Sequence, residues 1–152
     1  MEGYRSVPRG RGALLKANDL VLLDTNVLVA LAWPNHPFHS CAIEFMRERR
    51  TWATCAITQL GFVRISMNPA LAKTQIHCRQ ALDLLTEMVK DRGHRYLDGG
   101  PQPATDAVGF EHVTGHRQIT DAYLVRLAAS HGAMLATFDG GLKGMPGAIV
   151  VT

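Results

Sequence analysis

Three aspartates stand where an apolar segment meets a polar one, and their placement suggests a metal site. Asp24 follows the apolar residues 20–23, Asp139 follows the strand-like "AMLATF", and Asp121 lies in the first turn of a helix-like segment. Carboxylates that share a pocket repel one another and become partly protonated unless a cation holds them together. Mg²⁺ and Mn²⁺ suit such oxygen ligands and keep positions open for water and phosphate. The chemistry that this set predicts is phosphodiester hydrolysis by metal-activated water.

Each aspartate also has an ordinary structural explanation. Asp24 can cap a turn that begins at Thr25, and a carboxylate at position 121 suits the positive end of a helix dipole. "FDGG" around Asp139 is a common turn sequence. The metal interpretation therefore depends on the three side chains meeting at one place.

The elements that would bring them together follow from the pattern of apolar residues. Local signals mark the ends of the predicted helices. Ser40 is expected to cap the helix over residues 39–50, and Thr58 is expected to open the helix over residues 58–68. Gly132 follows the helix over residues 119–131 and is expected to end it. The predicted strands are residues 20–23, 52–56, 94–98, 133–138 and 148–152, the predicted helices are residues 39–50, 58–68, 73–92 and 119–131, and residues 99–105 are predicted as a loop.

Alternating strands and helices predict an α/β domain with a mostly parallel sheet covered on both faces. Ligands of such sheets bind at the carboxyl ends of the strands. Asp24 and Asp139 follow two strands directly, and helix starts lie along the same edge, so Asp121 is expected there too.

Length and composition point to one domain. The chain has 152 residues, 47% hydrophobic, and we divide it into a flexible basic leader, residues 1–18, and a single domain, residues 19–152. No apolar run approaches the roughly 20 residues of a membrane span and no signal-peptide pattern is present, so we expect no membrane association and a cytoplasmic location. The net charge of +3 is compatible with a polyanionic partner but does not establish one.

The cysteines and two histidines are expected to be structural. Cys41, Cys55 and Cys78 are widely spaced among apolar residues, which favours reduced thiols over disulfides or zinc ligands. His36 and His39 have a spacing that suggests a metal site, but a third ligand is lacking nearby. We therefore expect them to form a turn or a helix cap.

Four segments in order resemble the PIN domain, in particular the VapC toxins of bacterial VapBC toxin–antitoxin pairs. They are "VLLDTNVLVAL", "TQLGFVRISMNPA", "GHRQITDAYLVRLAASHGAMLATFDGGL" and the final apolar strand, which together span about residues 21–151. The resemblance implies a three-layer α/β/α fold and an Mg²⁺- or Mn²⁺-dependent endoribonuclease, usually a homodimer, held inactive by a VapB-like antitoxin. It also implies that Asp24, Asp121 and Asp139 are the catalytic, metal-binding acids and that Asn26 orders the loop of the first acid.

One position departs from the family pattern. Many PIN domains have a glutamate where this chain has Gln59, although some VapC-like sequences carry glutamine. A glutamine keeps a carbonyl oxygen for a metal-bound water but removes a negative charge, so we expect weaker metal binding than in a four-acid site. Glu44, Asp106 and Glu111 are candidates to replace the charge, and the sequence does not select among them.

Further residues are candidates for contact with RNA. Arg64, five residues after Gln59, can touch a phosphate or pair with a carboxylate, and His116, shortly before Asp121, can line the mouth of the pocket. The basic residues 47–50 more simply form a solvated helix end.

Two other functions compete with the nuclease. A receiver-like or flavodoxin-like module shares the architecture, but it would need paired acids or a phosphate-binding loop after the first strand, and "DTNVL" supplies neither. A PIN fold that binds RNA or a partner without cutting stays open because of Gln59. The RNA target, the identity of the antitoxin and the number of metal ions are not determined by the sequence.

Overall fold

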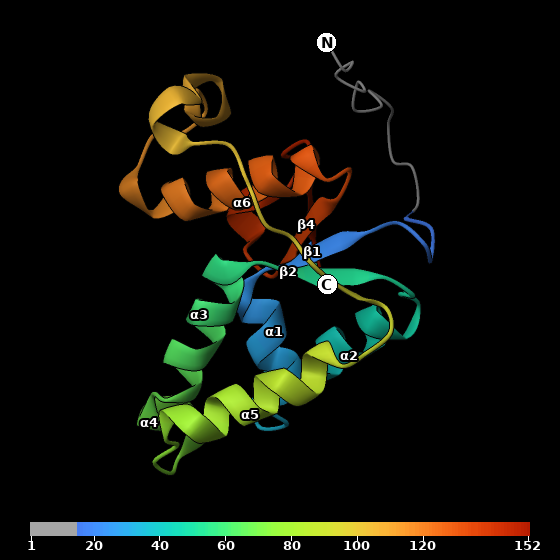
Figure 1. Cartoon of the computed structure of the whole chain (residues 1–152), viewed down its shortest axis with the longest axis vertical. Helices are drawn as coiled ribbons and strands as arrows, with labels where there is room; N and C mark the ends of the chain where they lie inside the picture. The colour runs from blue at the N-terminus through green and yellow to red at the C-terminus, as the bar shows by residue number, and fades with distance from the viewer. Residues whose placement is uncertain (1–14) are drawn as a thin grey trace.

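A computed structural model describes residues 15–152 of the chain, so the predicted leader up to residue 14 lies outside the described residues. The centre is a five-stranded parallel sheet with the order β3-β2-β1-β4-β5 (Figure 1). The strands are β1 (Val21–Leu23), β2 (Trp52–Thr54), β3 (His94–Tyr96), β4 (Met134–Thr137) and β5 (Ala148–Val150). The expected α/β class and parallel sheet are confirmed.

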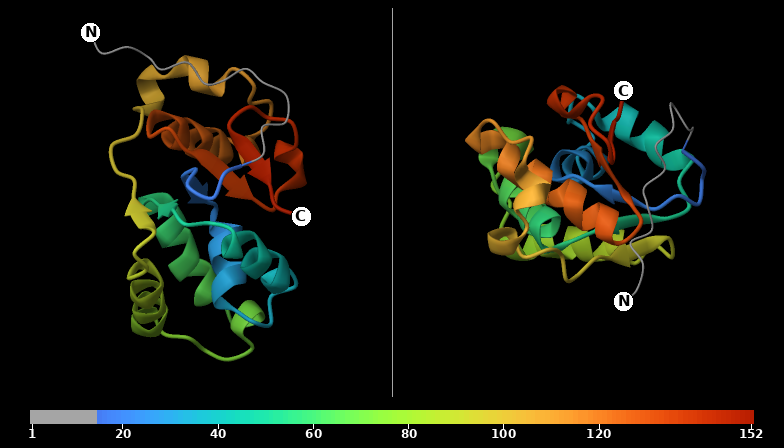
Figure 2. Two further views of the ribbon diagram at one scale, coloured as in Figure 1. Left: turned by 90° about the vertical axis from the view of Figure 1, so that its right-hand side faces the viewer. Right: turned by 90° about the horizontal axis from the view of Figure 1, so that it is seen from above.

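Helices form a layer on each face of the sheet (Figures 1 and 2). One layer contains α1, α2, α3 and α5, and α6 lies on the opposite face. The helices are α1 (Thr25–Ala32), α2 (His39–Arg47), α3 (Ala56–Ser66), α4 (Pro69–Ala72), α5 (Cys78–Val89) and α6 (Ile119–Ser130). Short 3-10 turns are η1 (Pro103–Thr105), η2 (Ala107–Phe110), η3 (His116–Gln118) and η4 (Gly140–Leu142).

Side chains of β1 alternate between two separate cores. Val21 and Leu23 pack with α1, α3 and α5 through residues such as Phe62, whereas Leu22 packs with Leu124 of α6. Successive residues of a strand point to opposite faces, so the next position, Asp24, falls on the α6 side. The buried residues of the strand thus determine which layer the first acid faces.

Several helix boundaries differ from the predictions. Helix α1 was not predicted, because its interior is buried on all sides and carries no amphipathic period. Helix α3 begins at Ala56 rather than Thr58, and Thr58 instead accepts a hydrogen bond from the backbone N–H of Cys55 at 3.0 Å. The predicted Ser40 cap of α2 is wrong, since Phe38 occupies the cap position and no side chain bonds there.

The segment around residues 69–77 also differs from the prediction. The helix expected over residues 73–92 starts only at Cys78, because Lys73 adopts a left-handed conformation with φ of 56° and ends the short helix α4. Part of the loop expected at residues 99–105 forms the turn η1.

An ion pair between Asp106 and Arg126 attaches the long connection between β3 and α6 to α6. The guanidinium of Arg126 donates to both carboxylate oxygens of Asp106, at 2.9 Å from Nε and 2.7 Å from Nη2. The Arg126 guanidinium lowers the pKa of Asp106 below its ordinary value. Bidentate pairs of this kind are geometrically specific, so the connection has a defined path over the helix.

Lys16 and Ala17 are hydrogen-bonded to the residues that follow α2. The backbone N–H of Arg50 donates to the carbonyl of Ala17 at 2.8 Å, and Arg49 donates to the carbonyl of Lys16. Within residues 15–152, no helix combines the length and the apolar character needed to cross a membrane.

The close packing of α1 on α3 depends on Gly61. A Cβ added there would lie 2.5 Å from Thr25 Oγ1 and 2.8 Å from Thr25 Cγ2. We expect Gly61→Ala to lower the free energy of unfolding by about 1–3 kcal/mol, because the helices must separate. Urea unfolding measures this change, with Gly115→Ala as the control, since a Cβ at Gly115 meets no atom within 4 Å. Equal stability of the two variants would contradict the packing argument.

Candidate active site

Asp24 is held at the junction of β1 and α1 by hydrogen bonds to both of its carboxylate oxygens. Oδ1 accepts from the backbone N–H of Thr25 at 2.7 Å, and Oδ2 accepts from the hydroxyl of Thr137 at 2.7 Å. The side chain caps α1 and is only 8% exposed. Asp24 therefore does have the helix-capping role that the sequence suggested, and the capping hydrogen bond fixes the orientation of its carboxylate.

Thr137 organises the other side of this junction. Its buried hydroxyl donates to Asp24 and accepts from Asn26 Nδ2 at 3.3 Å and from the backbone N–H of Asp139 at 3.1 Å. Asn26 Oδ1 in turn accepts from the backbone N–H of Phe138 at 3.2 Å. Asn26 thus orders the loop as expected. The role of Thr137 was not predicted, although its position two residues before Asp139 could have indicated a contact with the site.

The two remaining acids lie within electrostatic range of Asp24. Asp139 accepts a hydrogen bond from the backbone N–H of Gly141 at 2.8 Å, and Asp121 projects from the first turn of α6. Burial raises the pKa of Asp121 to about 6, and the charges of Asp24 and then Asp139 add to this increase. The structure therefore brings the three predicted acids to one edge of the sheet.

The pKa of Asp24 responds to the same neighbours. Burial raises the pKa above its ordinary value, the hydrogen bonds from Thr137 and Thr25 oppose the increase, and the charge of Asp139 adds to it. Both pKa shifts arise first from burial and then from neighbouring carboxylates, and within residues 15–152 no basic side chain is hydrogen-bonded to Asp24 or Asp121.

The donor set fits a hard divalent cation by chemistry. Three carboxylates offer oxygen ligands, and a dication would relieve the repulsion that adds to the effect of burial on the pKa of Asp121. Among residues 15–152, however, no three His, Cys, Asp or Glu side chains already stand in the arrangement of a metal cage. The carboxylates of Asp24 and Asp139 are instead turned toward protein donors.

Gln59 is engaged on the other side of the sheet end. Its Nε2 donates to Thr54 Oγ1 at 2.9 Å, and this hydroxyl also contacts His94 Nε2 at 2.8 Å. Within residues 15–152, no hydrogen bond joins Gln59 to any of the three acids. The expected contact of Gln59 with the site stays a prediction.

The other predicted contact residues lie at the surface. Arg64 on α3 and His116 at the start of η3 are exposed and form no hydrogen bond or ion pair within residues 15–152. Of the acids proposed to replace the missing charge, Glu44 pairs with Arg47 at 2.7 Å and Asp106 pairs with Arg126. Glu111 is exposed.

His36 and His39 have structural partners. His36 Nδ1 accepts from the backbone N–H of Phe38 at 3.1 Å, and His39 Nδ1 lies 2.7 Å from the carbonyl oxygen of Ala30. The turn expected at His36 is confirmed, whereas His39 is the first residue of α2 and contacts α1 instead of capping a helix.

Comparison with known proteins identifies the family. A family model described as the PIN domain matches residues 21–148. The chain belongs to the PIN domain family. The PIN domain is 40% identical over 125 residues to Ribonuclease VapC38 of Mycobacterium tuberculosis, covering 81% of this chain and 87% of that protein.

Two further proteins are similar to this PIN domain. Ribonuclease VapC29 of Mycobacterium tuberculosis is 36% identical over 132 residues, covering 86% of this chain and 94% of that protein. The crystal structure of VapBC2 from Rickettsia felis, bound to a DNA fragment from their promoter, matches with a TM-score of 0.53 and 15% identity, covering 86% of this chain and 96% of that chain. The structural likeness supports the fold, and the sequence relatives place the chain among VapC proteins.

The raised pKa of Asp121 predicts how stability depends on pH without metal. The native pKa of about 6 exceeds the ordinary value of 3.8, so the folded state binds more protons between these values. The Asp121 contribution to the free energy of unfolding therefore increases as the pH falls from about 6 to 4. We expect Asp121→Asn to be more stable than the wild type at pH 7 in chelator and to lose this pH dependence. Urea unfolding from pH 4 to 7 measures the stability and its pH dependence. A variant that is less stable than the wild type at pH 7 would contradict the claim that the ionised Asp121 destabilises the fold.

Proposed function

We propose that this PIN domain is an Mg²⁺- or Mn²⁺-dependent endoribonuclease and the toxin of a toxin–antitoxin pair. The observation that carries the proposal is the convergence of Asp24, Asp121 and Asp139, with mutual repulsion strong enough to contribute to the raised pKa of Asp121. Relatives named ribonuclease over most of the chain support the activity. The proposed RNA substrate implies a cytoplasmic location.

The residues of the chain divide the work of the proposed reaction. Asp24, Asp121 and Asp139 would hold the ion, which supplies a Lewis acid and a water of lowered pKa when bound. The hydrogen bonds of Thr137 and Asn26 hold Asp24 and the Asp139 loop in place. Fixed ligand orientation of this kind sets metal affinity and activity in other metal sites.

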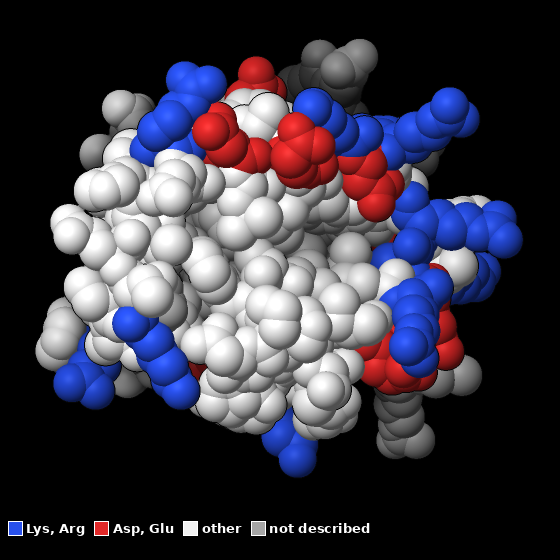
Figure 3. All heavy atoms as spheres, turned by 90° about the horizontal axis from the view of Figure 1, so that it is seen from below, with Lys and Arg blue, Asp and Glu red and all other residues white. Residues whose placement is uncertain are grey.

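Binding of a protein partner buries apolar surface, and apolar side chains are exposed on α3 and α5. Figure 3 shows, on the side of α3, α4 and α5, a broad face whose centre lacks charged side chains. Large exposed hydrophobic residues on these helices include Leu60 at 68% on α3 and Leu82 at 44% on α5. A second copy of this chain and a VapB-like antitoxin are the partners that we propose for such surface.

The alternative is a PIN domain that binds RNA or a partner without cutting it. The observation that favours it is that Gln59 contributes no negative charge and bonds to Thr54 rather than to the acids. The experiments below separate the two functions.

Asp24→Asn tests the nuclease directly. Asparagine keeps a side-chain oxygen for capping but removes the charge, so we expect metal-dependent cleavage of single-stranded RNA to fall at least about 100-fold. Cleavage is followed by gel electrophoresis with Mg²⁺, Mn²⁺ or a chelator, and Asp83→Asn, an exposed carboxylate on α5 paired with Arg79, serves as the control. Tight RNA binding without cleavage under either metal would favour the non-catalytic alternative.

Gln59→Glu tests whether position 59 belongs to the site. A carboxylate at position 59 that turns from Thr54 toward the three acids should raise the affinity for Mg²⁺, and isothermal titration measures it. We expect an increase of about tenfold, the size of an outer-ligand effect. Unchanged affinity would mean that the side chain stays with Thr54 and His94 and takes no part in metal binding.

A further inference from the structure

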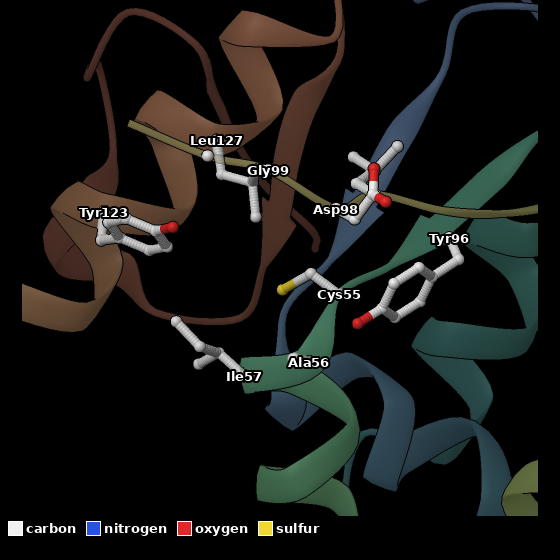
Figure 4. A pocket seen from close by; sticks show the side chains of 10 residues that line it. Cys55, Ala56, Ile57, Tyr96, Asp98, Gly99, Tyr123 and Leu127 are labelled. Carbon is white, nitrogen blue, oxygen red and sulfur yellow. The ribbon is translucent and has the colours of Figure 1, made fainter. Parts of the chain in front are cut away.

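A small cavity opens beside the acidic centre, between the start of α3, the chain after β3 and α6. Its volume is about 140 Å³. Lining residues include Cys55, Ile57, Tyr96, Asp98, Tyr123 and Leu127. Figure 4 shows Tyr96 and Tyr123 on opposite sides of the cavity, with Cys55 between them.

The cavity lies near the acidic centre, because Asp24 and the lining residue Cys55 follow adjacent strands. In the parallel pairing of β1 and β2, Leu22 lies opposite Ala53, so Asp24 and Cys55, each two residues further, end adjacent strands. Paired strands are about 4.8 Å apart. Both positions fall on the α6 side of the sheet, where Tyr123 follows Asp121 by two residues.

The lining favours a flat, partly apolar ligand with hydrogen-bond donors. Leu127 and Ile57 supply apolar walls, and the tyrosines supply rings on which a planar group can stack. The hydroxyls of Tyr96 and Tyr123 and the exposed carboxylate of Asp98 form no hydrogen bond or ion pair within residues 15–152. An ionised carboxylate only accepts hydrogen bonds, so the ligand must donate.

The same lining argues against a phosphate in this cavity. No lysine or arginine is among the residues that line it, and Asp98 would repel an anion. A nucleic-acid strand that places its scissile phosphate at the acids would therefore present a base here, not its backbone. Unpaired bases are commonly held by aromatic stacking and by hydrogen bonds to their edges.

Gly100 lines the same cavity close to the Tyr123 hydroxyl. A Cβ at Gly100 would collide with that hydroxyl and lie 3.0 Å from Leu127 Cδ1, so a larger residue there would require these side chains to shift. The chain after β3 and α6 therefore approach each other closely at this wall of the cavity.

We propose that this cavity binds one unpaired nucleobase of the RNA substrate and that Asp98 selects a base bearing an exocyclic amino group over uracil. Cytosine, adenine and guanine each offer such a donor to a carboxylate. The proposal rests on the proposed function, because it assigns the cavity to the strand that is cut. It makes Asp98 a specificity-determining residue and the two tyrosines a stacking site.

The test measures binding without cleavage. Asp24→Asn protein is titrated with fluorescent single-stranded hexamers of cytidine and of uridine, and with hexamers of adenosine and of purine riboside, which lacks the amino group. We expect tighter binding of the amino-bearing member of each pair. Asp98→Asn, added to this background, should reduce that preference about tenfold, the size of one base-edge contact.

Further variants separate stacking from selection. Tyr123→Leu should weaken binding of all four hexamers about tenfold without changing the preference. Asp83→Asn, away from the cavity, should change neither quantity. Thermal melting of each variant verifies that it is folded, and Asp98→Asn replaces an exposed side chain by one of the same shape.

The outcomes distinguish this proposal from the nuclease assignment. If the wild type cuts RNA and Asp98→Asn leaves the base preference unchanged, the cavity proposal is wrong and the nuclease stands. If the preference is lost in Asp98→Asn but the wild type cuts no RNA with either metal, the cavity proposal stands and the nuclease is wrong. A change only in oligomeric state, seen by size exclusion, would assign the cavity to a second copy of the chain and overturn the proposal.

Discussion

The hydrogen bond from Thr137 to Asp24, at 2.7 Å, joins the carboxyl ends of two adjacent parallel strands, and the acidic centre is arranged around it. The same hydroxyl accepts a hydrogen bond from the backbone N–H of Asp139, so Thr137 orients both Asp24 and the backbone at Asp139. One donor and two accepted bonds use the full capacity of a threonine hydroxyl. This buried network gives the site a single arrangement, because an unmet polar group there would destabilise the fold.

The buried, ionised Asp121 in the acidic centre lowers the stability of the folded protein. Burial and two neighbouring carboxylates raise the pKa of Asp121 to about 6, which means that its ionised form is disfavoured in the folded protein. Ionised aspartates elsewhere on protein surfaces usually lie in water or beside a basic side chain. Carboxylates with raised pKa values that lie close together often mark functional sites, which agrees with the proposed divalent cation.

The two proposed sites at this end of the sheet would combine two kinds of recognition. The acids are proposed to hold a divalent cation and, through it, a phosphate, and the nearby cavity with Tyr96, Tyr123 and Asp98 is proposed to hold a base. The two kinds of group alternate along a nucleic-acid strand. In the structure the Gln59 amide donates to Thr54 on the opposite side of the sheet end. A glutamine at this position therefore carries no negative charge, and its amide N–H has a partner within the fold.

The sequence by itself determined the parallel α/β architecture and the three acids, because alternating buried strands and helices place strand ends along one edge. It did not reveal α1, whose fully buried interior has no amphipathic period, or the start of α5, which depends on the left-handed Lys73. Only the tertiary structure decided that Thr137 binds Asp24, across 113 positions of the chain, and that Gln59 turns to Thr54. Local patterns specify which face a side chain takes, but contacts between distant segments are set by how the layers pack.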